Sequence, residues 1–92
     1  MIKVKTIEPV WLDDRVYLIY TFDYSEGKTL AILYDRDEKM SYDNAIIIVF
    51  DDHALYGGIQ ITESEYKEYE RAILHIRGIV LREVNDNGRR KI

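Results

Sequence analysis

The chain has 92 residues, no cysteine and a net charge of −4, with 47% hydrophobic and 12% aromatic residues. This length fits a single domain over residues 1–92, and the apolar content excludes a disordered chain. The lack of cysteine excludes disulfides, thiolate nucleophiles and cysteine-based metal sites, and it fits a reducing cytoplasm.

No segment of the sequence suggests a membrane partner. Residues 1–6 alternate between polar and apolar types without the apolar run of a signal peptide, and the longest apolar run, residues 45–50, is too short to cross a bilayer. We therefore expect a cytoplasmic protein. The chain is rich in Ile, Tyr, Asp, Lys and Asn, which is typical of AT-rich genes, including those of viruses and mobile elements. A protein encoded by such an element would act in the cytoplasm of its host cell.

The first third of the chain predicts three β-strands. Residues 3–7 alternate until Pro9 interrupts the pattern, which predicts a short first strand. Residues 15–24 form the longest alternating run, and residues 28–35 alternate again. Gly27 suits the left-handed position of the loop between these two runs, so we expect a β-hairpin.

The middle of the chain predicts a loop and two further strands. Residues 36–44 are polar and predict a loop. Residues 45–50 are apolar without alternation, which predicts a central strand buried on both faces. Residues 53–58 end on a pair of glycines and predict a turn, and residues 59–61 predict a short strand.

One helix is predicted over about residues 63–77. Thr62 and Glu65 form an S/T-x-x-E capping box, and Ile61 and Tyr66 stand where a hydrophobic staple sets the direction of entry. Spacings of three and four residues then define one apolar stripe, made of Tyr66, Tyr69, Ile73 and Ile76.

The end of this helix leaves two interpretations open. Gly78 can adopt the left-handed conformation that ends a helix, and the β-branched residues that follow favour an extra C-terminal strand at 79–84. Alternatively the helix continues, because Val80 extends its stripe. In that case Leu74 and Leu81 expose a second apolar surface, and a homodimer follows.

Together these elements predict an α+β fold: an antiparallel sheet of about five strands with one helix, about 63–77, packed on one face. An extra C-terminal strand at 79–84 would enlarge the sheet. The face away from the helix is expected to be semi-polar and to carry tyrosines.

Charge and aromatic content favour a protein partner. Five of the 13 basic residues lie near the chain ends, so the remaining 8 face 17 acidic residues and the body between carries −9. Such a body repels phosphates, so no direct nucleic-acid binding is expected, whereas a basic protein surface would attract it. The eight tyrosines can add contact area at such an interface.

The predicted partner-binding residues come from the polar loop and the end of the following strand: Asp35, Asp37, Glu38, Tyr42, Asp43, Asp51 and Asp52. No catalytic residue and no cofactor is predicted, since the serines lie outside a nucleophile elbow and the glycine pair precedes a strand. We therefore expect a small acidic protein-binding module without enzymatic activity. Its carboxylates would suit an inhibitor, encoded by a virus or mobile element, that occupies the basic channel of a host nucleic-acid-handling protein such as a defence nuclease.

Two other functions remain open. Asp51, Asp52 and His53 could hold a divalent cation with help from Asp35, Asp37 or Asp13, as in a small metal-dependent nuclease or phosphodiesterase. Successive residues of an extended strand point to opposite faces, which makes Asp51 and Asp52 poorly placed to share one ion. The other alternative is a dimeric regulatory or accessory subunit that associates through the helix.

Overall fold

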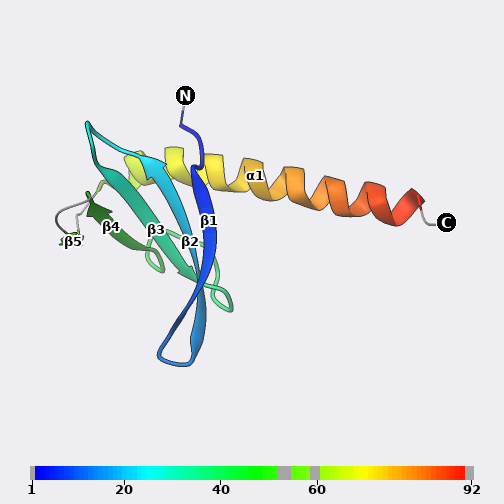
Figure 1. Ribbon diagram of the computed structural model, residues 1–92, viewed down its shortest axis with the longest axis horizontal. Coiled ribbons are helices and arrows are strands. Elements are labelled where there is room, and N and C mark those ends of the chain that lie inside the picture. Colours follow the sequence, from blue (N-terminus) through cyan, green and yellow to red (C-terminus); the bar gives the residue numbers. More distant parts are fainter. Residues whose placement is uncertain (1, 52–54, 59–60, 91–92) are drawn as a thin grey trace.

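A computed structural model of the chain describes residues 2–51, 55–58 and 61–90. It combines an antiparallel sheet with one α-helix, which confirms the α+β class (Figure 1). The elements are β1 (Thr6–Leu12), β2 (Arg15–Asp23), β3 (Thr29–Asp35), β4 (Ile46–Phe50), β5 (Leu55–Gly58) and α1 (Glu63–Arg90). Each strand pairs with the next one along the chain, so the spatial order is β1-β2-β3-β4-β5.

Two tight turns set the register of the first three strands. Asp13 and Asp14 join β1 to β2, and both have positive φ angles, 49° and 64°. Two central residues in this conformation characterise the type I′ turn, whose twist matches that of a hairpin. Gly27, with φ 72°, occupies the left-handed position in the loop between β2 and β3, as predicted.

The strands at the two edges of the sheet differ from the predicted ones. β1 runs from Thr6 to Leu12 through Pro9, which pairs with Leu18, instead of ending before the proline. An edge strand tolerates proline because one side of its backbone has no neighbour in the sheet. β5 lies at Leu55–Gly58, where a turn was predicted, and of the strand predicted at 59–61 only Ile61 is described, outside any strand.

One face of the sheet packs against the first half of α1. The pairing of β2 with β3 places Tyr20 beside Ile32 and Phe22 beside Leu30, on the side that the helix covers. The buried cluster formed there consists of Tyr20, Phe22, Leu30, Ile32, Tyr34, Val49, Ile61, Tyr66, Tyr69 and Ile73. The N-terminal segment and the loop between β3 and β4 pack against the same cluster, through Ile2, Val4, Met40 and Tyr42.

Tyrosines form much of this core: Tyr20, Tyr34, Tyr66 and Tyr69 are all buried. Tyr66 and Tyr69 confirm the predicted stripe of the helix, and Tyr69 meets Phe22 edge to face, with ring centroids 4.9 Å apart. Tyr20 and Tyr34 lie on the helix side of the sheet, whereas the face away from the helix carries Tyr17.

α1 begins at the predicted position. The Thr62 hydroxyl accepts a hydrogen bond from the Glu65 amide at 3.1 Å, so Thr62 is the N-cap. Ile61 and Tyr66, the two residues of the predicted staple, are both buried in the core cluster.

The end of α1 lies 13 residues beyond the predicted one, at Arg90 instead of residue 77. The helix continues through Gly78, as in the second of the two interpretations, so the helix end at residue 77 and the C-terminal strand at 79–84 are wrong. Glycine inside a helix costs only about 1 kcal/mol, which is too little to end it. The 28 residues of α1 span about 42 Å, and the second half extends beyond the sheet (Figure 1). Among the described residues, no helix has the length and apolar character needed to cross a membrane.

Candidate functional site

Residues 36–45 connect β3 to β4 and are called the carboxylate loop from here on. Three of the predicted partner-binding residues lie in this loop and are exposed to solvent. Its backbone is held by hydrogen bonds at both ends. The Arg36 amide donates to the Val16 carbonyl at 2.8 Å, and the Ala45 amide donates to the Tyr42 carbonyl at 3.3 Å. Between these ends, the Asn44 side-chain amide donates to the Lys39 carbonyl at 2.9 Å.

Asp35 anchors the start of the carboxylate loop. It is the last residue of β3 and is only 6% exposed. Its carboxylate accepts hydrogen bonds from the Asp37 amide at 2.9 Å and from the Arg15 guanidinium at 3.0 Å. The Asp37 amide first and Arg15 second lower the pKa of Asp35 below its ordinary value. Asp35 therefore stabilises the loop from within and is too buried to be a principal contact for a partner.

Tyr42 joins the loop to the start of α1. Its hydroxyl donates a hydrogen bond to the Ile61 carbonyl at 2.6 Å, and its ring centroid lies 5.3 Å from that of Tyr66. The side chain is half-buried, so its main contribution is to fix the loop against the core.

Asp37, Glu38 and Asp43 are the predicted partner-binding residues of the loop that are exposed. Asp37 lies 3.6 Å from the Arg36 guanidinium, but both side chains are well exposed, and a surface ion pair of this kind is weak. All three carboxylates are therefore available to a cationic partner.

The structure separates Asp51 from the carboxylate loop. β3 and β4 are antiparallel, so β4 leaves the loop at Ile46 and ends at Phe50, which pairs with Thr29 at the opposite end of β3. The five residues of β4 span about 16 Å, and Asp51 follows the far end. Asp52 and His53, predicted with Asp51 as a metal site, lie outside the described residues. Within the described part of the chain, no group of three histidine or carboxylate side chains is placed to hold a metal ion.

A pair of tyrosine hydroxyls lies beneath the start of α1. Tyr34 and Tyr66 share a buried hydrogen bond of 2.7 Å. Burial raises the pKa of Tyr34 to about 12, and burial followed by the hydrogen bond to Tyr34 raises the pKa of Tyr66 still further. Both hydroxyls keep their protons at neutral pH, which suits a structural role rather than proton transfer.

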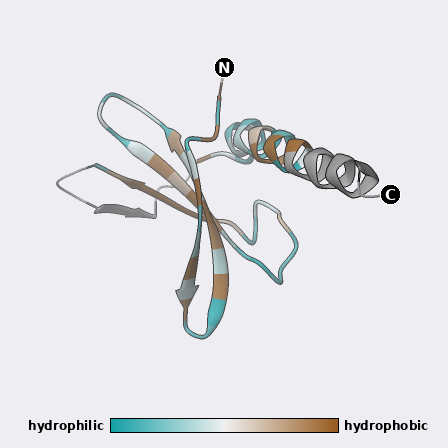
Figure 2. Cartoon of the chain, turned by 45° about the vertical axis from the view of Figure 1, so that its right-hand side comes forward, coloured by the Kyte–Doolittle hydropathy of each residue, from teal (hydrophilic) through white to brown (hydrophobic). Residues whose placement is uncertain are grey.

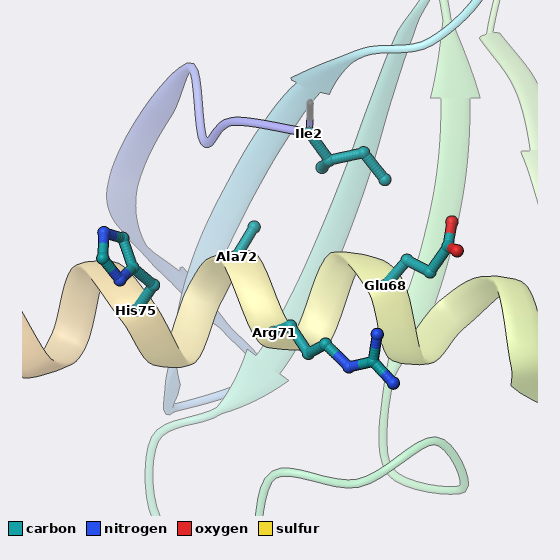
Figure 3. A pocket seen from close by; sticks show the side chains of 5 residues that line it. All are labelled: Ile2, Glu68, Arg71, Ala72 and His75. Carbon is teal, nitrogen blue, oxygen red and sulfur yellow. The ribbon is translucent and has the colours of Figure 1, made fainter.

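An open groove of about 580 Å³ lies between the N-terminal segment and α1. Figure 3 shows Ile2 opposite Ala72, with Glu68, Arg71 and His75 from neighbouring turns of the same helix. The carboxylate loop contributes no residue to the lining of this groove, so the structure does not join the two features.

Sequence analysis missed two features that affect the site. Arg15 was not identified as the partner of Asp35, because the two residues are 20 positions apart and only the pairing of β2 with β3 brings them together. Large exposed apolar side chains were also missed, among them Trp11 at 72%, Leu12 at 42% and Ile46 at 42%. The signal for Ile46 was present, since a strand that is apolar at every position has an apolar side chain on each face.

No family model matches this chain, and no curated protein or solved structure matches it either. The function proposed below therefore depends on the geometry and charge of the chain alone.

Proposed function

We propose that this chain is a small protein-binding module without enzymatic activity, which binds a basic protein surface through the carboxylate loop. The contacts are Asp37, Glu38 and Asp43, while Asp35 and Tyr42 hold the loop in place. A nucleic-acid-handling protein is a suitable partner, because its cationic channel is built to neutralise phosphates. In its most specific form, the chain is an inhibitor that blocks such a channel.

The observation that carries the proposal is the combination of exposed carboxylates with a fixed backbone. The loop is tied to β2 through Arg36 and to the start of α1 through Tyr42. Binding then costs little conformational entropy, since the loop is already ordered before the partner arrives. Carboxylates presented in this way favour both rapid encounter with a cationic surface and a defined orientation on it.

Charge reversal within the loop tests the proposal. The chain is used as bait in a lysate, the captured protein is identified by mass spectrometry, and its purified form is titrated by calorimetry at several salt concentrations. The double variant Asp37→Lys/Glu38→Lys should weaken binding at least about tenfold, which corresponds to about 1.4 kcal/mol. Binding to the unmodified chain should also weaken as salt is added.

A matched control is available at the hairpin of β2 and β3, with Asp23 at the end of β2 and Glu26 in the loop that follows. Asp23→Lys/Glu26→Lys makes the same change in net charge at exposed positions in another part of the chain, and it should leave binding nearly intact. Equal weakening by both double variants would mean that only overall charge matters. Unchanged binding in the Asp37→Lys/Glu38→Lys variant would exclude the carboxylate loop as the contact.

A further inference from the structure

The sheet has a second face on the side away from α1, where polar residues surround a group of apolar ones. We propose that this face is the interface of a homodimer, in which two copies pack sheet against sheet. This inference goes beyond the proposed function and does not depend on it, because the carboxylate loop packs against the helix side of the sheet.

The strand register defines this open face. Residues directly opposite each other in an antiparallel pair point to the same side, and successive residues of a strand alternate between sides. The pairs Val10–Tyr17, Ile19–Leu33 and Leu33–Ile46 therefore share one face, whereas Tyr20 and Ile32 point to the helix. The apolar residues at the centre of the open face are Val10, Tyr17, Ile19, Leu33, Ile46 and Ile48.

The open face is exposed in part: Leu33 and Ala31 of β3 are buried at its centre, at 5% and 4% exposure, whereas its margins reach solvent. α1, the N-terminal segment and the carboxylate loop all pack against the cluster on the opposite side of the sheet. Figure 1 shows α1 crossing a single face, and Figure 2 shows the apolar residues concentrated on the strands while the connecting loops are polar. Ile46 is 42% exposed as a result, and so is Leu12 at the end of the β1–β2 hairpin.

The sequence of β4 independently indicates that both faces are covered. An exposed sheet face is normally marked by polar residues at alternate positions, but β4 reads Ile-Ile-Ile-Val-Phe. Within one copy, Val49 on the helix side is buried, whereas Ile46 on the open face is exposed. A second copy placed on the open face would bury the remaining side of this strand.

Charge favours a second copy of this chain as the occupant. Two chains of net charge −4 repel each other, so they can associate only through a surface with little net charge. On the open face the Asp35 carboxylate is paired with Arg15 at 3.0 Å, and the Asp23 carboxylate is paired with Lys5 at 3.3 Å. Glu8 is the only other carboxylate on this face in β1 to β4. A strongly basic partner, by contrast, would find few carboxylates there.

The size of the face fits a reversible dimer. Four strands about 4.8 Å apart and about seven residues long cover about 450 Å² in flat projection, or about 900 Å² for two copies. This area lies below the range of stable specific interfaces, which begins at about 1,200 Å², so the dimer should be weak and reversible. The same patch would face itself across a two-fold axis, the commonest symmetry of homo-oligomers.

Sedimentation velocity tests the proposal when it is measured at protein concentrations from about 1 μM to about 1 mM. The unmodified chain should pass from monomer to dimer within this range. Ile46→Lys places a charge in the interface and should raise the dimer dissociation constant at least about tenfold. Leu12→Lys, on the same face at the hairpin end, should act in the same direction.

Leu74→Lys is the matched control, because Leu74 is 49% exposed on α1 and the substitution adds the same charge. It should leave the dimer intact. An unmodified chain that stays monomeric at every concentration would overturn the proposal. A dimer that Leu74→Lys dissociates and Ile46→Lys preserves would overturn it as well, and would indicate association through the helix.

A second measurement does not require the dimer to be broken. The chain has no cysteine, so Ile46→Cys and Leu74→Cys each introduce a unique thiol. Alkylation of the thiol at position 46 should slow as protein concentration rises, while alkylation at position 74 should keep a constant rate. Concentration-independent labelling at position 46 would contradict the interface even if the chain associates.

Discussion

At the scale of single residues, the Asp35 carboxylate connects the fold to the carboxylate loop. Its pKa is lowered by the Asp37 amide and by Arg15, so the ionised form is favoured in the folded state. This interaction stabilises the protein above the ordinary carboxylate pKa of about 4, and the contribution is lost as the pH falls through the lower pKa of the folded state.

We therefore expect Asp35→Asn to lower the denaturant midpoint at neutral pH and to reduce the acid sensitivity of stability below about pH 4. Urea unfolding at a series of pH values measures both effects. Asp43→Asn, which removes one exposed carboxylate from the same loop, serves as the control and should leave the denaturant midpoint at neutral pH almost unchanged. An identical acid profile for Asp35→Asn and the unmodified chain would contradict this role of Asp35.

The buried tyrosine pair predicts the opposite dependence in alkali. The unfolded chain releases a tyrosine proton near pH 10, whereas folded Tyr34 keeps its proton up to a pKa of about 12. The unfolded state therefore binds fewer protons in this interval, and the free energy of unfolding should fall as the pH rises from about 10 to about 12.

Tyr34→Phe tests the pair directly. At neutral pH it should lower the free energy of unfolding by about 1 kcal/mol, because Tyr66 loses a buried hydrogen-bond partner. It should also make the alkaline loss less steep. An unchanged free energy of unfolding at neutral pH would contradict this role of the pair.

At the scale of elements, the local signals at the helix start and in the β2–β3 loop were reliable, whereas the glycine pair of β5 and the signal for the helix end were not. The N-cap at Thr62 and the left-handed Gly27 require only neighbouring residues, and both were predicted. The end of α1 was not, since the preference of Gly78 for a helix terminus is small compared with the hydrogen bonds that a continuing helix makes.

Gly78 therefore lowers the stability of α1 but does not end the helix or change its course. No atom lies within 4 Å of the position that a β-carbon would occupy, and its φ angle is helical. Gly78→Ala should raise the free energy of unfolding by about 1 kcal/mol, which thermal or urea unfolding can measure. Gly27→Ala is the informative contrast: it should destabilise the chain, because Gly27 has φ 72° in equally open space. A loss of stability in Gly78→Ala would mean that α1 ends near residue 78 in solution.

At the scale of the whole molecule, α1 is the only helix of the described chain, and the sheet supports half of it. Among the side chains that the structure describes, Arg77 is the most C-terminal one bonded to the sheet, and its Nε donates to the Tyr20 hydroxyl at 2.9 Å. An unsupported helix of about 12 residues is marginal in water.

Amide hydrogen exchange should show this division along α1. Amides between residues 66 and 77 should be the best protected, and those from about residue 82 onward should exchange much faster, because they can open without unfolding the core. NMR or mass spectrometry measures the profile. Uniform protection to residue 90 would contradict the prediction and would indicate that a second surface covers this half of the helix.

The site was predictable only in part, because the exposure of its residues depends on contacts between distant parts of the chain. The sequence identified an acidic loop, but it predicted Asp35 and Asp37 alike as partner-binding residues. One is buried against Arg15 and the other is exposed, and this difference arises from the pairing of β2 with β3. Grouping Asp51 with the loop failed in a similar way, since the antiparallel course of β4 carries it to the other end of the sheet.

The sequence by itself determined the α+β class, the hairpin at Gly27 and the capped start of the helix, because each depends on alternation, turn chemistry or capping among near neighbours. Tertiary structure alone decided which tyrosines of the sheet enter the core, which carboxylates stay in solvent and which face of the sheet α1 leaves open. These outcomes depend on strand register and on the side of the sheet that α1 covers, and both bring together residues that are far apart in the chain.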